Sequence, residues 1–300
     1  MILLLFTNVY YVMANNKVAF LSNHFSGYNV LKLIESNIDL LLIQPTSKQT
    51  KNISGFVDFD TNEFQNKEKY FIRSYNLCDD IKEFEKLKVD VLLVAGYQRL
   101  LPKEILENCR LGAFGFHGSS NKLPKGRGRS PINWEIINGK KNFIIHMFEL
   151  TENADEGGIL DHREFKIELS DNVKTVYHKV AFFIAEMILD QLPKILENKH
   201  SSSLQKGNAT YFKKRTKEDS LIDFNKTTYE IYNFVRALAD PYPNAFFYFN
   251  ENKIIAKRAY PFLDQSVFFK NSKKAGDLIQ ILSNNEYLFK TNDGSIILEV

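Results

Sequence analysis

Short apolar runs alternate with segments of helical periodicity through the first two thirds of this chain of 300 residues. The runs are rich in valine, leucine, isoleucine and phenylalanine, which is typical of strands buried on both faces. Strands that alternate with helices form crossover units, so the pattern predicts an α/β fold with a parallel sheet. The predicted strands cover residues 17–21, 40–44, 70–75, 89–97, 112–118, 142–150 and 157–167. The predicted helices cover residues 28–36, 79–87, 101–108, 131–138 and 172–197.

The character of the chain changes near residue 200. Residues 200–210, HSSSLQKGNAT, are polar and lack an apolar period, which favours a linker. A helix is predicted over 227–238, and the strand candidates AFFYF, KIIAKR, DLIQIL, YLFKT and SIILEV follow with turn signals between them, which predicts a small antiparallel β domain. The predicted division is an N-terminal extension (1–16), an α/β domain (17–199), a linker (200–220) and a C-terminal domain (221–300).

The composition narrows the class of protein. Hydrophobic residues make up 44% and charged residues 25%, and the formal charge of +3 neither requires nor excludes nucleic acid. Cys78 and Cys109 have no metal-ligand spacing and are too few for a disulfide framework. We therefore expect buried structural thiols, a cytoplasmic location and no metal. The sequence also lacks a phosphate-binding lysine loop and a glycine-rich dinucleotide motif after the first strand.

The first twelve residues, MILLLFTNVYYV, form an apolar segment. A secretory signal begins with positive charge and ends in a small-residue cleavage site, and this segment has neither. It is also too short to span a bilayer. We expect Met13 to be the natural start, or residues 1–12 to be dispensable, and we expect no membrane role. Association of this segment with a membrane is the alternative.

One histidine and one aspartate stand where predicted strands end. His117 lies near the end of GAFGFHG, and Asp155 follows the run at 142–150 in an Asp-Glu-Gly-Gly turn. The carboxyl ends of parallel strands meet at one edge of the sheet, where α/β proteins bind their ligands. We expect the two strands to be parallel neighbours, so that the imidazole and the carboxylate act together in proton transfer. A structural histidine and a turn-capping aspartate are the alternatives.

Several segments together resemble the folate-dependent formyltransferase family. HGSSNKLPKGRGRSPINWEIINGK, followed by NADEGGI, carries the resemblance, and AGYQRLLPKEIL is similar to the family's folate-binding strand end. The tail TKEDSLIDFNKTTYEIYNFVRALADPYPNAFFYF resembles methionyl-tRNA formyltransferase and the formyltransferase that modifies UDP-aminoarabinose. GRGRSPINW, KKRTKEDS and RALADPYPNAF are closer to the sugar-nucleotide enzyme. The resemblance covers residues 17–300 and implies a Rossmann-like catalytic domain followed by a small OB-like domain.

The resemblance implies transfer of a formyl group from 10-formyltetrahydrofolate to a primary amine. The family works with an asparagine, a histidine and an aspartate. His117 and Asp155 match the last two, whereas Gly115 stands at the asparagine position. Asn121, in a loop about two residues longer than the family's usual loop, is a catalytic candidate because it could replace the missing amide donor. A backbone N–H is the other candidate donor.

The resemblance also implies binding residues. The cofactor-binding candidates are Tyr97, Gln98, Arg99, Leu100, Leu101 and Ala154. The substrate-binding candidates are Arg127, Arg129, Ser130 and Arg215. Arginine suits phosphate or carboxylate because its forked donors bind two oxygens at once. The alternatives are that Tyr97 belongs to the core and that the arginines keep a loop and a linker solvated.

Two classes of function remain open. We expect an N-formyltransferase acting on a nucleotide-linked amino sugar, as in polysaccharide biosynthesis, with methionyl-tRNA formylation as the alternative in the same family. Residues 206–300 carry 14 Lys plus Arg against 11 Asp plus Glu, a net of +3, which is weak for a domain that binds tRNA phosphates. Because of Gly115, a folate- or nucleotide-binding protein without transferase activity is the second class. The resemblance alone also suggests a homodimer.

Overall fold

The structure, a computed structural model, describes residues 16–46, 49, 55–59, 62–216, 218–262, 274–283 and 285–300. The predicted extension (1–16) and the expected start at Met13 lie outside these residues, except for Asn16. Two compact units make up the chain. The first comprises residues up to Gly128, Ile144–Phe165 and Tyr177–Tyr211, and the second comprises Arg129–Phe143, Lys166–Val176 and Phe212–Val300. The predicted boundaries at 199 and 220 stay a prediction.

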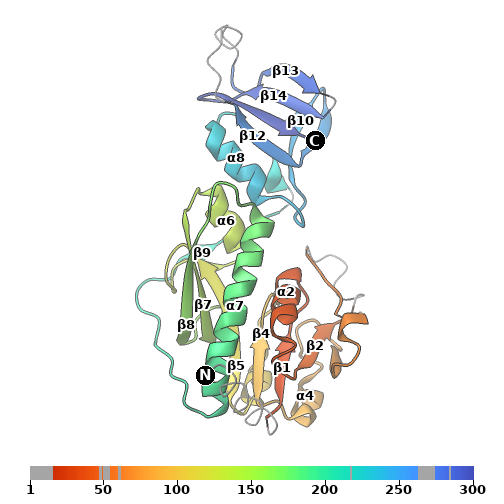
Figure 1. The fold of residues 1–300 in the computed structure, drawn as a ribbon, viewed down its shortest axis with the longest axis vertical. Coiled ribbons are helices and arrows are strands. Elements are labelled where there is room, and N and C mark those ends of the chain that lie inside the picture. The colour runs from red at the N-terminus through yellow and green to blue at the C-terminus, as the bar shows by residue number, and fades with distance from the viewer. Residues whose placement is uncertain are drawn as a thin grey trace. The chain divides into compact units, whose positions relative to one another are not determined.

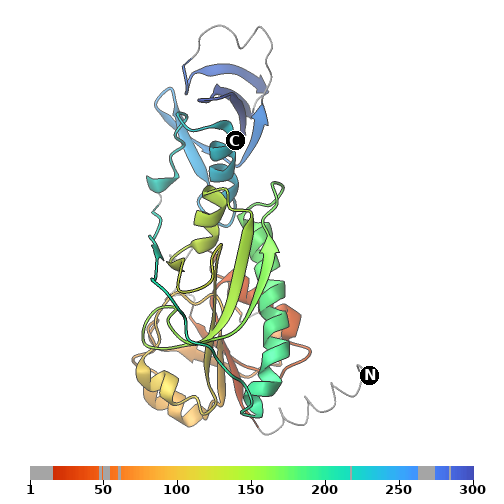
Figure 2. The ribbon, with the colours of Figure 1, turned by 90° about the vertical axis from the view of Figure 1, so that its left-hand side faces the viewer.

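A seven-stranded sheet organises the first unit, with the strand order β3-β2-β1-β4-β5-β7-β8 (Figure 1). Its strands are β1 (Val18–Leu21), β2 (Leu41–Pro45), β3 (Lys69–Ile72), β4 (Val91–Val94), β5 (Gly112–Ser119), β7 (Asn142–Glu149) and β8 (Ile159–Lys166). The helices beside it are α2 (Phe25–Ile34), α4 (Ile81–Leu87), α5 (Lys103–Glu107) and α7 (Val173–Leu196). Together, Figures 1 and 2 show α2 and α7 on one face of the sheet and α4 and α5 on the other.

Burial on both faces explains the apolar runs of the sequence. Every residue of β1 and β4 is buried, and their sequences, VAFL and VLLV, are apolar throughout rather than alternating. Parallel pairing joins β3, β2, β1, β4 and β5. The predicted α/β fold class with a Rossmann-like sheet is therefore confirmed.

The strand β7 departs from the predicted parallel arrangement. It pairs antiparallel with β5, in a register that sets His117 opposite His146 and Phe114 opposite Glu149. The carboxyl end of β7 therefore returns toward the start of β5 instead of ending beside His117. The expectation of parallel neighbours was wrong because an apolar run buried on both faces has the same composition in either direction.

The second unit contains a small antiparallel β domain, as predicted, and two helices that pack on each other, α6 (Pro131–Ile137) and α8 (Thr228–Ala237). A four-stranded sheet has the order β12-β15-β14-β13, with antiparallel pairing throughout, and β10 and β11 form an antiparallel pair. These strands are β10 (Ala245–Phe249), β11 (Asn252–Ala256), β12 (Arg258–Phe262), β13 (Leu278–Ser283), β14 (Glu286–Lys290) and β15 (Ser295–Glu299). Two short strands, β6 (Arg127–Gly128) and β9 (Tyr211–Phe212), pair with each other.

The sequence analysis missed β12. Its segment contains Pro261, which cannot donate a hydrogen bond to a neighbouring strand and therefore argues against a central strand. Among the strands that the structure describes, β12 lies at the edge of its sheet and pairs with β15. An edge position tolerates the proline, and only the pairing reveals that position.

A buried polar turn connects β1 to α2. His24 caps the helix, since its Nδ1 accepts the Ser26 N–H at 3.2 Å and pairs with Ser26 Oγ at 2.8 Å. Gly27 lets the helix approach the end of β4, because a Cβ there would lie 2.4 Å from the oxygen of Ala95. Burial lowers the pKa of His24 from 6.5 to about 4, because the imidazolium would lose its water in this turn.

Acid should destabilise the protein through His24. Its folded pKa lies below the unfolded value, so the unfolded chain binds the proton more readily and stability falls as the pH drops from about 6.5 toward 4. We expect this residue to remove about 2 kcal/mol of stability at pH 5 relative to pH 7.5, measured by denaturant unfolding at both values. His24→Asn keeps a capping side chain, and the loss of stability between pH 7.5 and pH 5 should be about 2 kcal/mol smaller in this variant than in the wild type. An equal loss in the two proteins would contradict a neutral, buried imidazole at His24.

Candidate active site

The imidazole of His117 is held on both sides. His117 is buried on β5, and its Nε2 lies 2.7 Å from the carbonyl oxygen of Gly126. A carbonyl oxygen only accepts, so Nε2 carries the hydrogen. On the other side, His117 Nδ1 lies 3.4 Å from Asp155 Oδ2. In the imidazolium form both ring nitrogens donate, one to the loop carbonyl and one to the carboxylate.

The carboxylate of Asp155 reaches His117 by a loop between β7 and β8. Asp155 has a φ of +57°, and its Oδ2 accepts the Gly128 N–H at 3.2 Å. The turn then passes close to the end of β7, where a Cβ on Gly157 would lie 1.7 Å from the oxygen of Glu149. The glycines of the Asp-Glu-Gly-Gly motif therefore permit the return that brings the carboxylate to the imidazole.

The loop after β5 carries Asn121. Ser119 is fully buried, and its Oγ donates to the Asn121 carbonyl at 2.7 Å, which fixes the start of the loop. The Asn121 side chain is exposed and its Nδ2 donates to Ser120 Oγ at 3.1 Å. Within the described part of the chain, no hydrogen bond joins Asn121 to His117 or Asp155. The structure thus brings together two of the three proposed catalytic residues.

Leu150 fills the space beside Gly115. Gly115 and His117 are two residues apart on β5, so a side chain at 115 would share the face of His117. A Cβ at Gly115 would lie 2.6 Å from Leu150 Cδ2 and 3.4 Å from Phe148 Cζ. An apolar contact therefore occupies the position at which the resemblance expects an amide.

The proposed folate residues follow the end of β4. The Tyr97 hydroxyl donates to the Tyr75 carbonyl, and burial raises the pKa of Tyr97. The Arg99 guanidinium lies 4.8 Å from the centre of the Tyr75 ring, a cation–π distance. Gln98, Arg99, Leu100 and, in the β7–β8 loop, Ala154 are exposed, whereas Leu101 is buried in the core.

Arg127 is an internal residue rather than part of a solvated loop. Its Nη1 lies 3.0 Å from Glu156 Oε1 and 3.2 Å from the Tyr211 hydroxyl, and its Nη2 donates to Gln205 Oε1 at 2.7 Å. Only 6% of the residue is exposed. The guanidinium therefore already has protein partners on two of its three nitrogens.

The other substrate-binding candidates belong to the second unit. Arg129 donates its N–H to the Phe212 carbonyl at 3.3 Å, and Ser130 stands at the N-cap position of α6 with a φ of +55° and no side-chain capping hydrogen bond. The Arg215 guanidinium lies 5.0 Å from the Trp134 ring centre, and burial lowers its pKa. Trp134 in turn donates from its indole nitrogen to the Lys213 carbonyl at 2.8 Å.

Three polar residues at the site were not singled out from the sequence. His146 pairs its Nδ1 with the His117 carbonyl at 3.3 Å, and burial lowers its pKa to about 4. Gln205 and Thr210 lie in the predicted linker and bond to the loops that carry Asp155 and Arg127. The sequence alone does not predict these contacts. They depend on which segments of the chain pack together, and a histidine in an apolar run or a polar linker carries no information about that.

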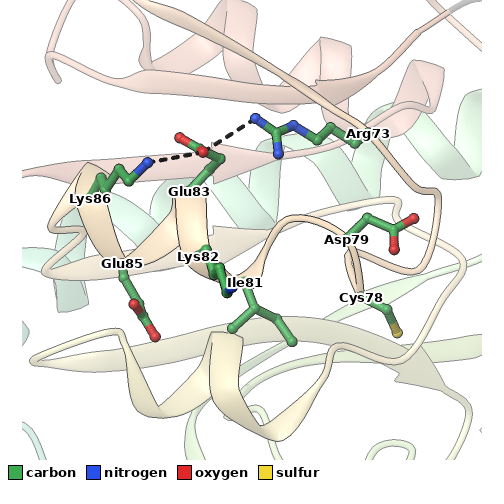
Figure 3. Close-up of a pocket in the computed structure, with 8 residues that line it drawn as sticks. All are labelled: Arg73, Cys78, Asp79, Ile81, Lys82, Glu83, Glu85 and Lys86. Carbon is green, nitrogen blue, oxygen red and sulfur yellow. Dashed lines mark hydrogen bonds and ion pairs between the residues drawn. The ribbon is translucent and has the colours of Figure 1, made fainter.

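A surface hollow beside α4 holds none of the proposed site residues (Figure 3). It is lined by Arg73, Cys78, Asp79, Ile81, Lys82, Glu83, Glu85 and Lys86. Figure 3 shows Lys86 and Arg73 both paired with Glu83, at 3.0 and 3.3 Å. These charges are therefore matched within the protein. Cys78 at the hollow is exposed and Cys109 is buried, so the expectation of two buried thiols was half wrong.

The residues that the structure describes offer neither a metal site nor a membrane span. Among them, no three His, Cys, Asp or Glu side chains are grouped so that they could hold a metal ion. No helix in the described ranges combines the length and apolar character needed to cross a bilayer.

Comparison with known proteins identifies the family. Residues 17–192 match the formyl transferase family, and residues 214–300 match the formyl transferase C-terminal domain. The chain therefore belongs to the formyl transferase family, and the resemblance inferred from its motifs is confirmed.

Similar proteins include a relative in sequence and two solved structures. The bifunctional polymyxin resistance protein ArnA of Wigglesworthia glossinidia brevipalpis is 35% identical over 211 residues, which are 70% of this chain and 31% of that protein. HypX from Aquifex aeolicus, in complex with tetrahydrofolic acid, has a TM-score of 0.68 at 18% identity, over 94% of this chain and 43% of that chain. An N-formyltransferase from Helicobacter canadensis, in complex with folinic acid and dTDP-3-aminofucose, has a TM-score of 0.65 at 18% identity, over 95% and 98% of the two chains. The chain thus spans about a third of the length of ArnA, and the likeness to the solved structures is one of fold.

Thiol labelling should distinguish the two cysteines. Burial raises the pKa of the Cys109 thiol to about 12, so its reactive thiolate is both scarce and covered. We expect one label per native chain and two per denatured chain, counted by mass spectrometry. Cys78→Ser should remove the native label entirely. Rapid native labelling of Cys109 would contradict its packing.

Proposed function

We propose that this chain is an N-formyltransferase that moves a formyl group from 10-formyltetrahydrofolate to the amine of a nucleotide-linked amino sugar. Membership of the formyl transferase family supports the reaction. The Helicobacter canadensis structure, with folinic acid and dTDP-3-aminofucose, supports this pair of substrate classes. The observation that carries the proposal is the 3.4 Å contact between His117 Nδ1 and Asp155 Oδ2.

The proposed reaction needs an oxyanion partner and a proton acceptor. The neutral amine attacks the formyl carbon and forms the new C–N bond, and the formyl oxygen becomes an oxyanion. The carbonyl then re-forms as the bond from that carbon to the folate nitrogen breaks, and the nitrogen leaves with the proton that the amine gave up. His117 Nε2–H donates to the oxyanion, while Asp155 stabilises the imidazolium and takes the amine's proton through water.

In this structure the Gly126 carbonyl accepts the hydrogen bond from His117 Nε2. The formyl oxygen must therefore replace that carbonyl as the acceptor when the reaction begins. An oxyanion is the stronger acceptor because a charged partner strengthens the hydrogen bond. The exchange favours the transition state over the ground state, which is the condition for catalysis.

The binding roles follow from the same proposal. Tyr97, Gln98, Arg99, Leu100, Leu101 and Ala154 are the proposed folate residues. Arg129, Ser130 and Arg215 are proposed for the sugar nucleotide, since arginine suits its phosphates. Arg127 we assign instead to support of the Asp155 turn, because its guanidinium is buried among Glu156, Tyr211 and Gln205. Asn121 is not retained as an oxyanion donor, because its exposed amide bonds to Ser120.

A substrate panel tests the class of function. Purified protein with 10-formyltetrahydrofolate is offered 3-amino and 4-amino sugar nucleotides and methionyl-tRNA, and formylated product is followed by mass spectrometry. Turnover with a sugar nucleotide is expected. Turnover with methionyl-tRNA alone would replace the sugar proposal, and folate binding without turnover on any amine would identify a binding protein.

Removal of either catalytic side chain should abolish turnover. His117→Ala and Asp155→Ala should each lose more than about 99% of kcat, a loss of roughly 3 kcal/mol or more, since each removes an interaction that the transition state needs. Asp79→Ala, at an exposed carboxylate, is the matched control and should retain activity. Near-normal turnover by either active-site variant, with melting temperatures unchanged, would refute the assignment.

Restoring an amide at position 115 should require Leu150 to move. Gly115→Asn alone places its Cβ 2.6 Å from Leu150 Cδ2, so the half-buried leucine must turn away, and any gain in kcat should be smaller than with that side chain removed. Gly115→Asn combined with Leu150→Ala opens the space, and kcat should exceed that of Leu150→Ala alone by about tenfold or more, because an oxyanion donor is gained. Equal rates in the two variants would show that another group already supplies this donor.

A further inference from the structure

Part of the predicted linker holds the two loops of the site. Ser203 and Ile159 exchange two backbone hydrogen bonds, at 2.8 and 2.9 Å, at the start of β8. Thr210 accepts the Arg127 N–H with its carbonyl at 2.9 Å and the Gly126 N–H with its Oγ1 at 2.9 Å. One stretch of chain therefore touches both the loop after His117 and the strand that follows the Asp155 turn.

Gln205 lies between these two attachments and uses both ends of its amide. Its Nε2 donates to the Asp155 carbonyl at 2.7 Å and to the Gly157 carbonyl at 2.9 Å. Its Oε1 accepts from Arg127 Nη2 at 2.7 Å. A carbonyl only accepts and a guanidinium only donates, so the opposite orientation of the amide would lose all three bonds. The neighbours of Gln205 therefore fix its orientation.

The Asp155 turn needs such support. Asp155 adopts the left-handed backbone conformation, which costs a non-glycine residue free energy, although aspartate tolerates it better than most residues. Gln205 holds the turn through carbonyls within and just beyond it, and Arg127 pairs with Glu156 in the middle of the turn. Without the Gln205 amide, two carbonyls and one guanidinium nitrogen lose this hydrogen-bond partner. The left-handed conformation of the turn is then less stable.

We propose that Gln205 is a positioning residue for Asp155. By holding the backbone on both sides of Glu156, it aims the Asp155 carboxylate at His117 and ties it to the buried Arg127. Gln205 does not touch the reacting atoms, and its effect passes through Asp155. The catalytic part of this inference rests on the proposed formyl transfer, whereas the positioning part concerns the protein alone.

The Gly128 amide gives a readout of position that needs no substrate. Its N–H donates to Asp155 Oδ2 at 3.2 Å, so its hydrogen exchange reports whether the carboxylate keeps its place. Gln205→Glu is the sharpest variant, since it retains an acceptor for Arg127 and replaces the donor to the two carbonyls with an oxygen. Lys206→Ala, an exposed neighbour in the same segment, is the matched control.

We expect Gln205→Glu and Gln205→Ala to speed Gly128 exchange, followed by NMR, by about tenfold or more, with Lys206→Ala unchanged. With 10-formyltetrahydrofolate and the sugar nucleotide that turns over, kcat should fall by about 10- to 100-fold while both KM values stay within about twofold. Unchanged Gly128 exchange in both Gln205 variants would overturn the positioning role, whatever the activity. Faster exchange with unchanged kcat would overturn its catalytic consequence. If the wild-type protein transfers no formyl group, the proposed function fails, and the exchange experiment still decides the role of Gln205.

Discussion

The contact between the imidazole of His117 and the carboxylate of Asp155 depends on a turn that folds back on its own strand. β7 runs antiparallel to β5, so it ends opposite Phe114 and carries the chain away from His117. The loop to β8 must then return over several residues to place Asp155 Oδ2 at 3.4 Å from His117 Nδ1. Gly157 makes the return possible, because a side chain there would collide with the backbone of Glu149.

Three polar side chains around this contact bond to backbone atoms, whereas the buried Nε of Arg127 has no hydrogen-bond partner among the described residues. The oxygen of Ser119 bonds within the His117 loop, His146 bonds to the backbone of β5, and Gln205 bonds to the backbone of the Asp155 turn. A backbone carbonyl has a fixed direction, so each of these bonds also fixes the geometry of a loop. These bonds hold the loops around His117 and Asp155, and on the proposed mechanism the Gly126 carbonyl must still leave His117 Nε2 before the formyl oxygen can bind there.

The packing at Gly115 differs from what the family resemblance implies for this position. The family resemblance places an amide two residues before the histidine, and here Leu150 closes the space instead. The exchange replaces a polar donor with an apolar contact on the face of β5 that carries His117. On the proposed mechanism, more of the oxyanion stabilisation then falls on the imidazole. The buried Arg127 supports the neighbouring turn, since its hydrogen bonds go to Glu156, Tyr211 and Gln205.

The amino-acid sequence by itself determined the layered fold and the chemical groups of the site. The runs VAFL and VLLV predicted strands covered on both faces, and the motifs around His117 and Asp155 marked these two residues as candidates. Tertiary structure alone decided the direction of β7, the edge position that admits Pro261 in β12, and the contacts that Gln205 makes from an apparent linker. Local composition indicates whether a segment is buried, because the tendency to be buried depends on the polarity of each side chain. Strand direction and hydrogen-bond partners are properties of pairs of segments, and they exist only once those segments have met.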